Sequence, residues 1–178
     1  MARLRQDERD GFDEFVAARR AGLLRTAVLL TGDRGRAEDL LQTAFLTTYR
    51  HWRRLDDQRD PVGYVRRVLV TTHLNWARRR WSTESVLAEL PDAGSPGHDS
   101  AVVEQLRMRA ALGTLPPRMR AALVLRFYED LSEADTARVM DCSVGTVKSQ
   151  TSRGLARLRE HLDAPHHPTV PAREETWR

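Results

Sequence analysis

Cysteine and lysine are almost absent from this 178-residue chain, which has one of each, Cys142 and Lys148. A single cysteine excludes an intrachain disulfide and a zinc site built on a cysteine cluster. The sequence has no run of about 18 apolar residues, so we expect no membrane insertion. Its charged start, MARLRQDERDGFDEF, lacks the apolar core of a signal peptide. We therefore expect a cytoplasmic protein.

Patterns typical of catalysis and of cofactor binding are also missing. There is no GxxxxGK[ST] phosphate loop and no His/Cys/Ser arrangement suited to nucleophilic catalysis. His161, His166 and His167 stand at a helix end and in a proline-rich tail, without carboxylates at ligand spacing, and do not predict a metal site. Cys142 precedes a predicted helix whose N-terminus could lower the pKa of the thiol, but we favour a small turn-filling residue. We expect no enzyme and no cofactor.

Charge is unevenly distributed along the chain. The net charge is +4, composed of +6 in residues 1–80, −4 in 81–100, +2 in 101–163 and zero in 164–178. Arginine supplies all basic residues except Lys148. A GC-rich genome explains this bias first, although arginine also suits forked contacts with phosphates and base edges.

Apolar periodicity predicts an all-α fold of two small helical domains joined by a flexible linker. No segment alternates with period two for long enough to predict a strand. We expect domains at 1–80 and 101–163, an acidic linker at 81–100 that contains PDAGSPGHDS, and a disordered tail at 164–178. The expected helices are Phe12–Leu30, Asp33 to about Arg54, Pro61 to Arg80, Ala101–Thr114, Arg118–Tyr128, Ser132–Met140 and Val144–Leu162.

The last two of these helices predict a helix-turn-helix. Ser132 and Ser143 are suitable N-caps, and Asp141 and Cys142 form the short turn. The final helix has a core stripe of Val147, Thr151, Leu155, Leu158 and Leu162. Small, polar and basic residues lie off this stripe, where they can reach base edges and phosphates of duplex DNA: Thr146, Lys148, Ser149, Ser152, Arg153 and Arg157. The alternative is a helical hairpin whose basic face is only solvated.

Residues 61–80 form a second basic segment, with five arginines and no acid. Tyr64, Trp76 and the adjacent Trp81 are interleaved with them, and aromatic faces stack on unpaired bases. The segment therefore suits single-stranded or melting DNA. The alternative is that Tyr64 and Trp76 are core residues. His73 suits packing or a phosphate contact better than catalysis.

Four strings carry a resemblance to a known family: AEDLLQTAFLTTYRHW, YVRRVLVTTHLNWARRR, LPPRMRAALVLRFYEDLSEADTARVMDCSVGTVKS and RGLARLR. Over about residues 10–80 and 101–162 the chain resembles the extracytoplasmic-function (ECF) sigma factors of bacterial RNA polymerase, in particular the SigE-type group of actinobacteria. The resemblance implies a non-enzymatic promoter-specificity subunit of two α-helical domains.

The resemblance also implies which residues contact polymerase and promoter. The helix at 38–52 would bind core polymerase through Asp39, Gln42, Leu46 and Arg50. The loop at 56–60 and the helix at 61–80 would open and read the −10 element, and the final helix would read the −35 element through the six residues named above. The implied −10 contacts are Tyr64, Arg66, Arg67, Thr71, Asn75, Arg78 and Arg79. Thr43, Tyr64 and Thr71 replace residues frequent in the family.

The implied partners are the core polymerase, at its beta-prime clamp helices and beta flap, promoter DNA, and an anti-sigma factor. In the holoenzyme the protein would be associated with the nucleoid, and its acidic linker would thread toward the RNA exit path. One rival function is a helix-turn-helix repressor or activator that does not bind core polymerase, which would leave residues 61–80 and the linker unexplained. An enzyme is the second rival.

Overall fold

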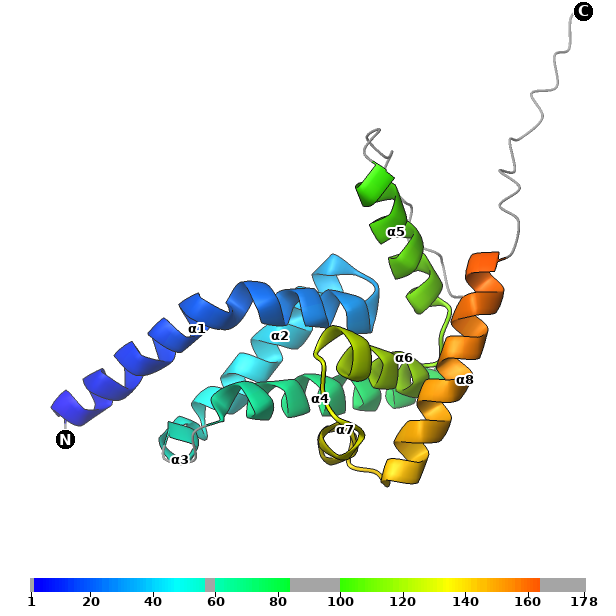
Figure 1. The fold of residues 1–178 in the computed structure, drawn as a ribbon. Helices are drawn as coiled ribbons and strands as arrows, with labels where there is room; N and C mark the ends of the chain where they lie inside the picture. Colours follow the sequence, from blue (N-terminus) through cyan, green and yellow to red (C-terminus); the bar gives the residue numbers. More distant parts are fainter. Residues whose placement is uncertain (1, 57–59, 84–99, 164–178) are drawn as a thin grey trace, which may run out of the picture.

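The structure, a computed structural model, describes residues 2–56, 60–83 and 100–163 and is built of helices throughout these ranges (Figure 1). The all-α prediction is confirmed. In chain order the elements are α1 (Ala2–Thr31), α2 (Arg34–Tyr49), α3 (Trp52–Asp56), α4 (Pro61–Thr83), α5 (Ser100–Gly113), α6 (Pro117–Leu123), the π-helix η1 (Val124–Tyr128), α7 (Glu133–Met140) and α8 (Val144–Asp163).

The first domain is formed by α1, α2 and α4, which pack on one another through their apolar stripes. Asp33 starts α2 as predicted, because its carboxylate accepts a hydrogen bond from the backbone N–H of Arg36 at 2.7 Å. Asp60 caps α4 in the same way, accepting from the Gly63 N–H at 2.8 Å. Burial of each leucine contributes about 1.5–3 kcal/mol to stability. The buried residues of these helices include Leu23, Ala27, Leu30, Ala37, Leu40, Leu41, Ala44, Val65, Leu69 and Val70.

The second domain is held by the packing of α8 on α6 and α7. Leu155 and Leu158 pack against a small cluster that includes Leu115 and Leu123, as the predicted stripe requires. Gly154 is buried as well, and a Cβ atom there would lie 3.2 Å from Leu123 Cδ1. This glycine therefore allows α8 to approach α6 closely.

Several predicted boundaries differ from the structure. The helix expected to continue to Arg54 ends at Tyr49, and α3 begins at Trp52 after a tight turn in which the His51 N–H bonds the Thr48 carbonyl at 2.9 Å. The α4 helix runs to Thr83, beyond the expected start of the linker. The segment expected as one helix over 118–128 changes from α to π geometry at Val124. Residues 84–99 of the linker and the tail at 164–178 lie outside the described residues.

The two domains pack against each other, and one apolar cluster runs through both. Residues of α6, η1 and α7 join the first domain's core: Ala121, Ala122, Val124, Leu125 and Met140. In Figure 1, α6 and α7 lie beside α4, and α5 and α8 lie toward the right of the view, where α8 packs against α6 and α7. The sequence predicted two domains but did not predict this packing.

A buried arginine reinforces the contact between the domains. Arg120 of α6 donates through Nη1 to the Leu30 carbonyl at 3.0 Å, and through Nη2 to the carbonyls of Gly113 and Leu115. It therefore neutralises the negative C-terminal ends of α1 and α5 together. Burial lowers the pKa of Arg120, but a guanidinium remains protonated at neutral pH.

His73 of α4 is buried near Arg120, in the packing role that was one of its two predicted roles. Its Nε2 atom makes no hydrogen bond to the part of the chain described here. Burial, followed by the positive charge of Arg120, lowers the pKa of His73 from 6.5 to about 4. The native protein therefore keeps this imidazole neutral at neutral pH.

This burial predicts a loss of stability in mild acid. Between pH 6.5 and 4 the unfolded chain binds a proton at His73 and the native protein does not, so the free energy of unfolding falls as pH decreases. We expect a loss of roughly 1–2 kcal/mol between pH 7 and pH 5, measured by urea denaturation. The variant His73→Leu should lose less over the same interval. Equal losses in the two proteins would contradict the assignment.

Candidate functional site

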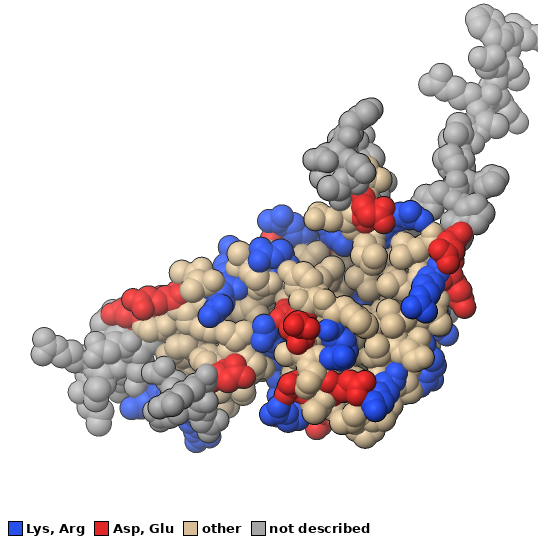
Figure 2. Space-filling view, viewed as in Figure 1, with Lys and Arg blue, Asp and Glu red and all other residues tan. Residues whose placement is uncertain are grey.

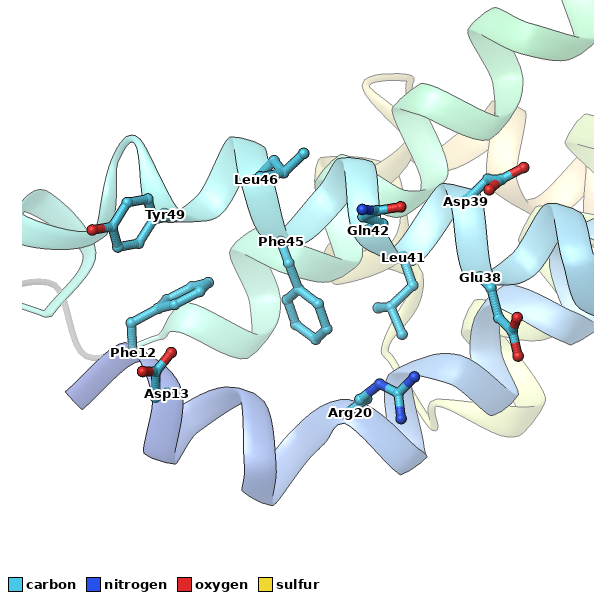
Figure 3. A pocket seen from close by; sticks show the side chains of 10 residues that line it. All are labelled: Phe12, Asp13, Arg20, Glu38, Asp39, Leu41, Gln42, Phe45, Leu46 and Tyr49. Carbon is cyan, nitrogen blue, oxygen red and sulfur yellow. The ribbon is translucent and has the colours of Figure 1, made fainter. Parts of the chain in front are cut away.

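A groove of about 680 Å³ lies between α1 and α2 and contains three of the four predicted polymerase contacts. Asp39, Gln42 and Leu46 follow one edge of α2 and point away from α1 (Figure 3). Leu46 is 57% exposed, which is high for a leucine in a helical domain. Arg50 is exposed after the end of α2 and is not among the residues that line the groove.

The floor of this groove is aromatic. Phe12 and Phe45 project toward each other from α1 and α2, with ring centroids 6.4 Å apart (Figure 3). Phe12 also lies 5.1 Å from the rings of Tyr49 and of the buried Trp52. Charged residues, Asp13, Arg20, Glu38 and Asp39, also line it. An apolar centre with a polar rim is typical of a protein–protein interface.

Position 43, one of the three positions where the sequence departs from the family that it resembles, adds no charge to this surface. The Thr43 hydroxyl donates to the Asp39 carbonyl on its own helix at 2.9 Å. Asp39 and Glu38 therefore provide the negative charge of the groove on α2. The sequence analysis missed the contribution of α1, because the aromatic and charged residues of α1 meet α2 only in the folded chain.

The predicted −10 contacts divide between two faces of α4. At 100° per residue, Tyr64, Arg67, Thr71, Asn75, Arg78 and Arg79 share one side of the helix. Arg67, Asn75, Arg78 and Arg79 are exposed there. Arg66 projects instead from the side that carries Val65, Leu69 and His73, and its Nε lies 2.6 Å from Glu129 Oε2 of the second domain. The structure thus separates Arg66 from the other six predicted contacts.

Three side chains on α4 show how far the aromatic and polar predictions apply. Trp76 is half-buried and packs against the shared apolar cluster, which favours the core interpretation. Tyr64 is half-buried, with its ring centroid 5.9 Å from that of His51. The Thr71 hydroxyl donates to the Arg67 and Val68 carbonyls on its own helix. Trp81 lies within α4, but its side chain is not among those described.

The helix-turn-helix has the predicted caps and turn. Ser132 accepts from the Asp135 N–H at 3.0 Å and Ser143 accepts from the Thr146 N–H at 3.1 Å. Asp141 takes a left-handed backbone conformation, φ 51°, and so ends α7. A hydrogen bond from the Ser132 hydroxyl, together with Arg138, lowers the pKa of the Asp135 carboxyl. These contacts define where α7 begins and ends and where α8 begins.

The predicted duplex-reading side chains lie on the solvent side of α8. Lys148, Ser152, Arg153 and Arg157 are exposed, and Thr146 and Ser149 are half-buried. Arg153 donates through Nη2 to Ser149 Oγ at 3.1 Å, so its guanidinium lies along the N-terminal half of the helix. Lys148 Nζ is 3.6 Å from Glu133, an exposed ion pair that contributes little to stability.

Basic groups on the visible surface lie among acidic ones (Figure 2). Lysine and arginine side chains line the right-hand edge of that view, over α8, next to aspartates and glutamates. The face of the molecule that Figure 2 shows is therefore not uniformly basic.

Cys142 fills the turn before α8, half-buried, and burial raises the pKa of its thiol. The possibility that the helix N-terminus lowers this pKa was therefore wrong. Among residues 2–56, 60–83 and 100–163, no three His, Cys, Asp or Glu side chains gather as a metal site would require. Within the same ranges no helix combines the length and apolar character needed to cross a membrane.

Comparison with known proteins finds a matching family for each of the two helical domains. The chain matches the family described as "Sigma-70 region 2" over residues 15–83 and the family described as "Sigma-70, region 4" over residues 105–158. It is 39% identical over 153 residues to the RNA polymerase sigma-E factors of Streptomyces avermitilis and Streptomyces coelicolor, covering 86% of this chain and 86% of each relative.

Solved structures show a similar fold. The sigma factor RpoE from Bartonella quintana, in complex with the anti-sigma factor NepR, is 23% identical, with a TM-score of 0.62 over 88% of this chain and 99% of that one. CnrH, in complex with the cytosolic domain of CnrY, is 22% identical, with a TM-score of 0.60 over 89% of this chain and 91% of that one.

Proposed function

The chain belongs to the sigma-70 family of RNA polymerase sigma factors, in its ECF subfamily, and from this premise we propose which of its residues bind polymerase and which bind promoter DNA. It directs core polymerase to specific promoters and initiates DNA-templated transcription. The observation that carries this conclusion is the presence of both matches, regions 2 and 4, in one all-helical chain. A helix-turn-helix repressor would require only the second.

We propose that the groove between α1 and α2 binds the beta-prime clamp helices of core polymerase. Leu46 would supply the apolar centre, and Asp39 and Gln42 the polar rim. Arg50 would add a cationic contact beside the groove. The domain at 101–163 would make a second contact, with the beta flap.

The two DNA-reading surfaces would perform different tasks. The exposed side of α4 combines cations with Tyr64, which suits unpaired bases of the −10 element as the strands separate. The N-terminal half of α8 presents a capped helix end, small residues and Arg153, which suit the major groove of the −35 element. We propose that the linker at 81–100 lets the domains reach both elements.

One of the solved structures with a similar fold is a sigma factor in complex with an anti-sigma factor. We propose that an anti-sigma factor regulates this chain by covering the groove or the surface between the domains. We further propose that the protein acts in the cytoplasm, joins the nucleoid as part of the holoenzyme, and catalyses no reaction itself, since the polymerase performs the chemistry.

Binding to core polymerase tests this assignment against the rival repressor. The full chain is mixed with sigma-free core enzyme, and complex formation is followed by size-exclusion chromatography. We expect a stoichiometric complex that makes promoter thymines reactive to permanganate, as strand opening requires. A protein that bound duplex DNA alone and never core enzyme would be a repressor or activator instead.

A further inference from the structure

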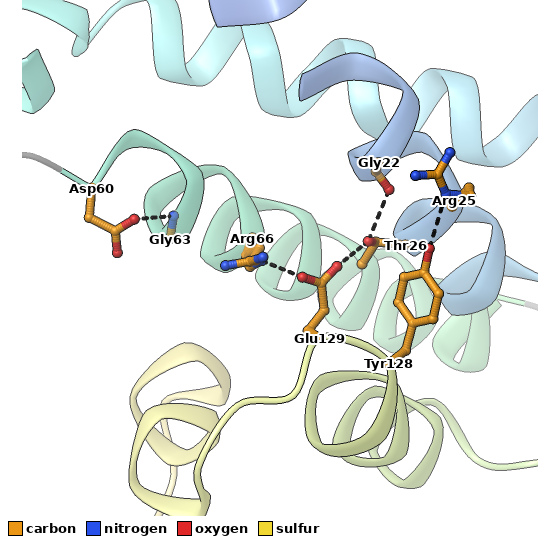
Figure 4. A network of polar contacts seen from close by, with 8 residues as sticks. All are labelled: Gly22, Arg25, Thr26, Asp60, Gly63, Arg66, Tyr128 and Glu129. Atoms are coloured by element: carbon orange, nitrogen blue, oxygen red, sulfur yellow. Dashed lines mark hydrogen bonds and ion pairs between the residues drawn. The ribbon is translucent and has the colours of Figure 1, made fainter. Parts of the chain in front are cut away.

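Glu129, at the end of η1, connects the two domains through polar contacts (Figure 4). Its Oε2 lies 2.6 Å from Arg66 Nε on α4, and its Oε1 accepts a hydrogen bond from the Thr26 hydroxyl on α1. Beside it, the Tyr128 hydroxyl accepts from Arg25 Nε at 3.2 Å. One carboxylate of the second domain therefore contacts two helices of the first.

This ion pair is partly shielded from water, chiefly on the Glu129 side. The Glu129 side chain is 8% exposed and that of Arg66 is 27% exposed. Loss of one partner leaves the other charge partly buried without compensation, so this pair matters more than an exposed one. The π-helical turn contributes to the geometry, since the Glu129 N–H bonds the Val124 carbonyl five residues back at 3.0 Å.

The packed arrangement cannot read both promoter elements. The −10 and −35 elements are roughly 25 base pairs apart, or about 85 Å along the duplex at 3.4 Å per base pair. In the structure α4 packs on α7, and α8, which also packs on α7, is only about 30 Å long. Simultaneous contact with the two elements requires the domains to separate, and separation breaks the Glu129 contacts.

We propose that Glu129 is an intramolecular latch, which holds the unbound protein in a closed state that cannot span a promoter. This inference rests on the proposed function for its regulatory meaning, but the latch itself does not. Closure reduces the concentration of binding-competent protein. The apparent affinity for polymerase and promoter is the affinity of the open state multiplied by the fraction of molecules that are open. Opening also releases the Arg66 guanidinium from its carboxylate.

The test measures the open fraction directly by single-molecule energy transfer. Dyes are attached to cysteines that replace the exposed Ala17 on α1 and Ala156 on α8, in a Cys142→Ser background. We expect Glu129→Gln, which keeps the side-chain shape and removes the charge, to raise the open-to-closed ratio roughly tenfold. Asp130→Asn is the matched control, because it removes the same charge from an exposed neighbouring residue and asparagine tolerates its positive φ.

A charge swap distinguishes the latch from general damage to the fold. The double variant Arg66→Glu with Glu129→Arg should return toward the closed state, whereas each single variant should open. Equal open fractions in Glu129→Gln, Asp130→Asn and the wild type would overturn the latch. So would a double variant as open as the single ones, or a wild type that is already mostly open.

The inhibitory effect of the latch on transcription is measured with core polymerase in a run-off assay. The concentration of Glu129→Gln that gives half-maximal transcript should be roughly tenfold below that of wild type, in line with the open fraction. Opening without this change would overturn the inhibitory role. Absence of transcription with every protein, including wild type, would count against the proposed function, while the energy-transfer result would still decide the latch.

Discussion

The variant Leu46→Arg should lose at least thirtyfold in affinity for core RNA polymerase. Leu46 lines the groove between α1 and α2, where we propose it as the apolar centre of the interface, and its 57% exposure means that the substitution leaves the fold intact. A central apolar residue of an interface commonly accounts for about 2 kcal/mol of binding, which corresponds to about thirtyfold. A buried arginine without a partner adds to this cost. Fluorescence anisotropy with labelled protein and sigma-free core enzyme measures the loss.

A matched control is available on α5. Val103 is 44% exposed, lies outside the groove, and can be replaced by arginine in the same way. Val103→Arg should retain more core affinity than Leu46→Arg, and Asp39→Ala should lose about tenfold as a rim charge. Both groove variants should bind isolated duplex DNA like wild type. If the α5 control lost as much affinity as Leu46→Arg, the groove would not be the polymerase site.

The second large effect is expected at Arg153. Replacement by alanine should weaken binding to the −35 duplex between about fivefold and a hundredfold, as expected for an arginine that reads a base edge. The side chain is exposed and held along the N-terminal half of α8 by Ser149, so its removal spares the core. The loss should be smaller on unrelated duplexes of equal length, which anisotropy titrations at fixed salt concentration can measure.

Arg159 provides the comparison for this prediction. It is also exposed, on the same helix, but lies farther from the helix N-terminus that enters the groove. Arg159→Ala should therefore reduce affinity by less and equally for all duplexes. Equal losses for Arg153→Ala on specific and unrelated DNA would mean that this residue contacts only the phosphates.

Much of the fold could be predicted from local signals. Asp33, Ser132 and Ser143 start their helices through side-chain caps, and these motifs need only neighbouring residues. The core stripe of α8 followed from its period, as Val147 and the leucines after it show. The break after Tyr49 was missed, because the apolar period continues through the turn to the buried Trp52.

The features that long-range packing creates could not be predicted in this way. Helical periodicity places Arg66 and Arg67 on different sides of α4, but the sequence does not show that Arg66 faces Glu129, which is far away along the chain. In the sequence, Arg120 is one more basic residue of a helix. Its role follows only from the folded chain, in which the C-terminal end of α1 lies beside it. The role of Gly154 likewise depends on the position of Leu123. In each case a segment distant along the chain determines the environment of the residue.

The candidate site likewise combines features that local sequence signals predict with features that only long-range packing creates. The basic, aromatic and small residues of α4 and α8 were identified by type and spacing, and most of them lie on exposed faces. The groove needed both α1 and α2, and its aromatic floor of Phe12, Phe45 and Tyr49 was identified only in the structure.

Run-off transcription with sigma-free core polymerase on a genomic DNA library is the most direct measurement of the central claim. Addition of the purified full chain should yield transcripts with defined 5′ ends that share sequence near −10 and −35, and core enzyme alone should yield none of them. If the chain bound core enzyme or DNA but produced no defined transcript from any template, its assignment as a promoter-directing subunit would be contradicted.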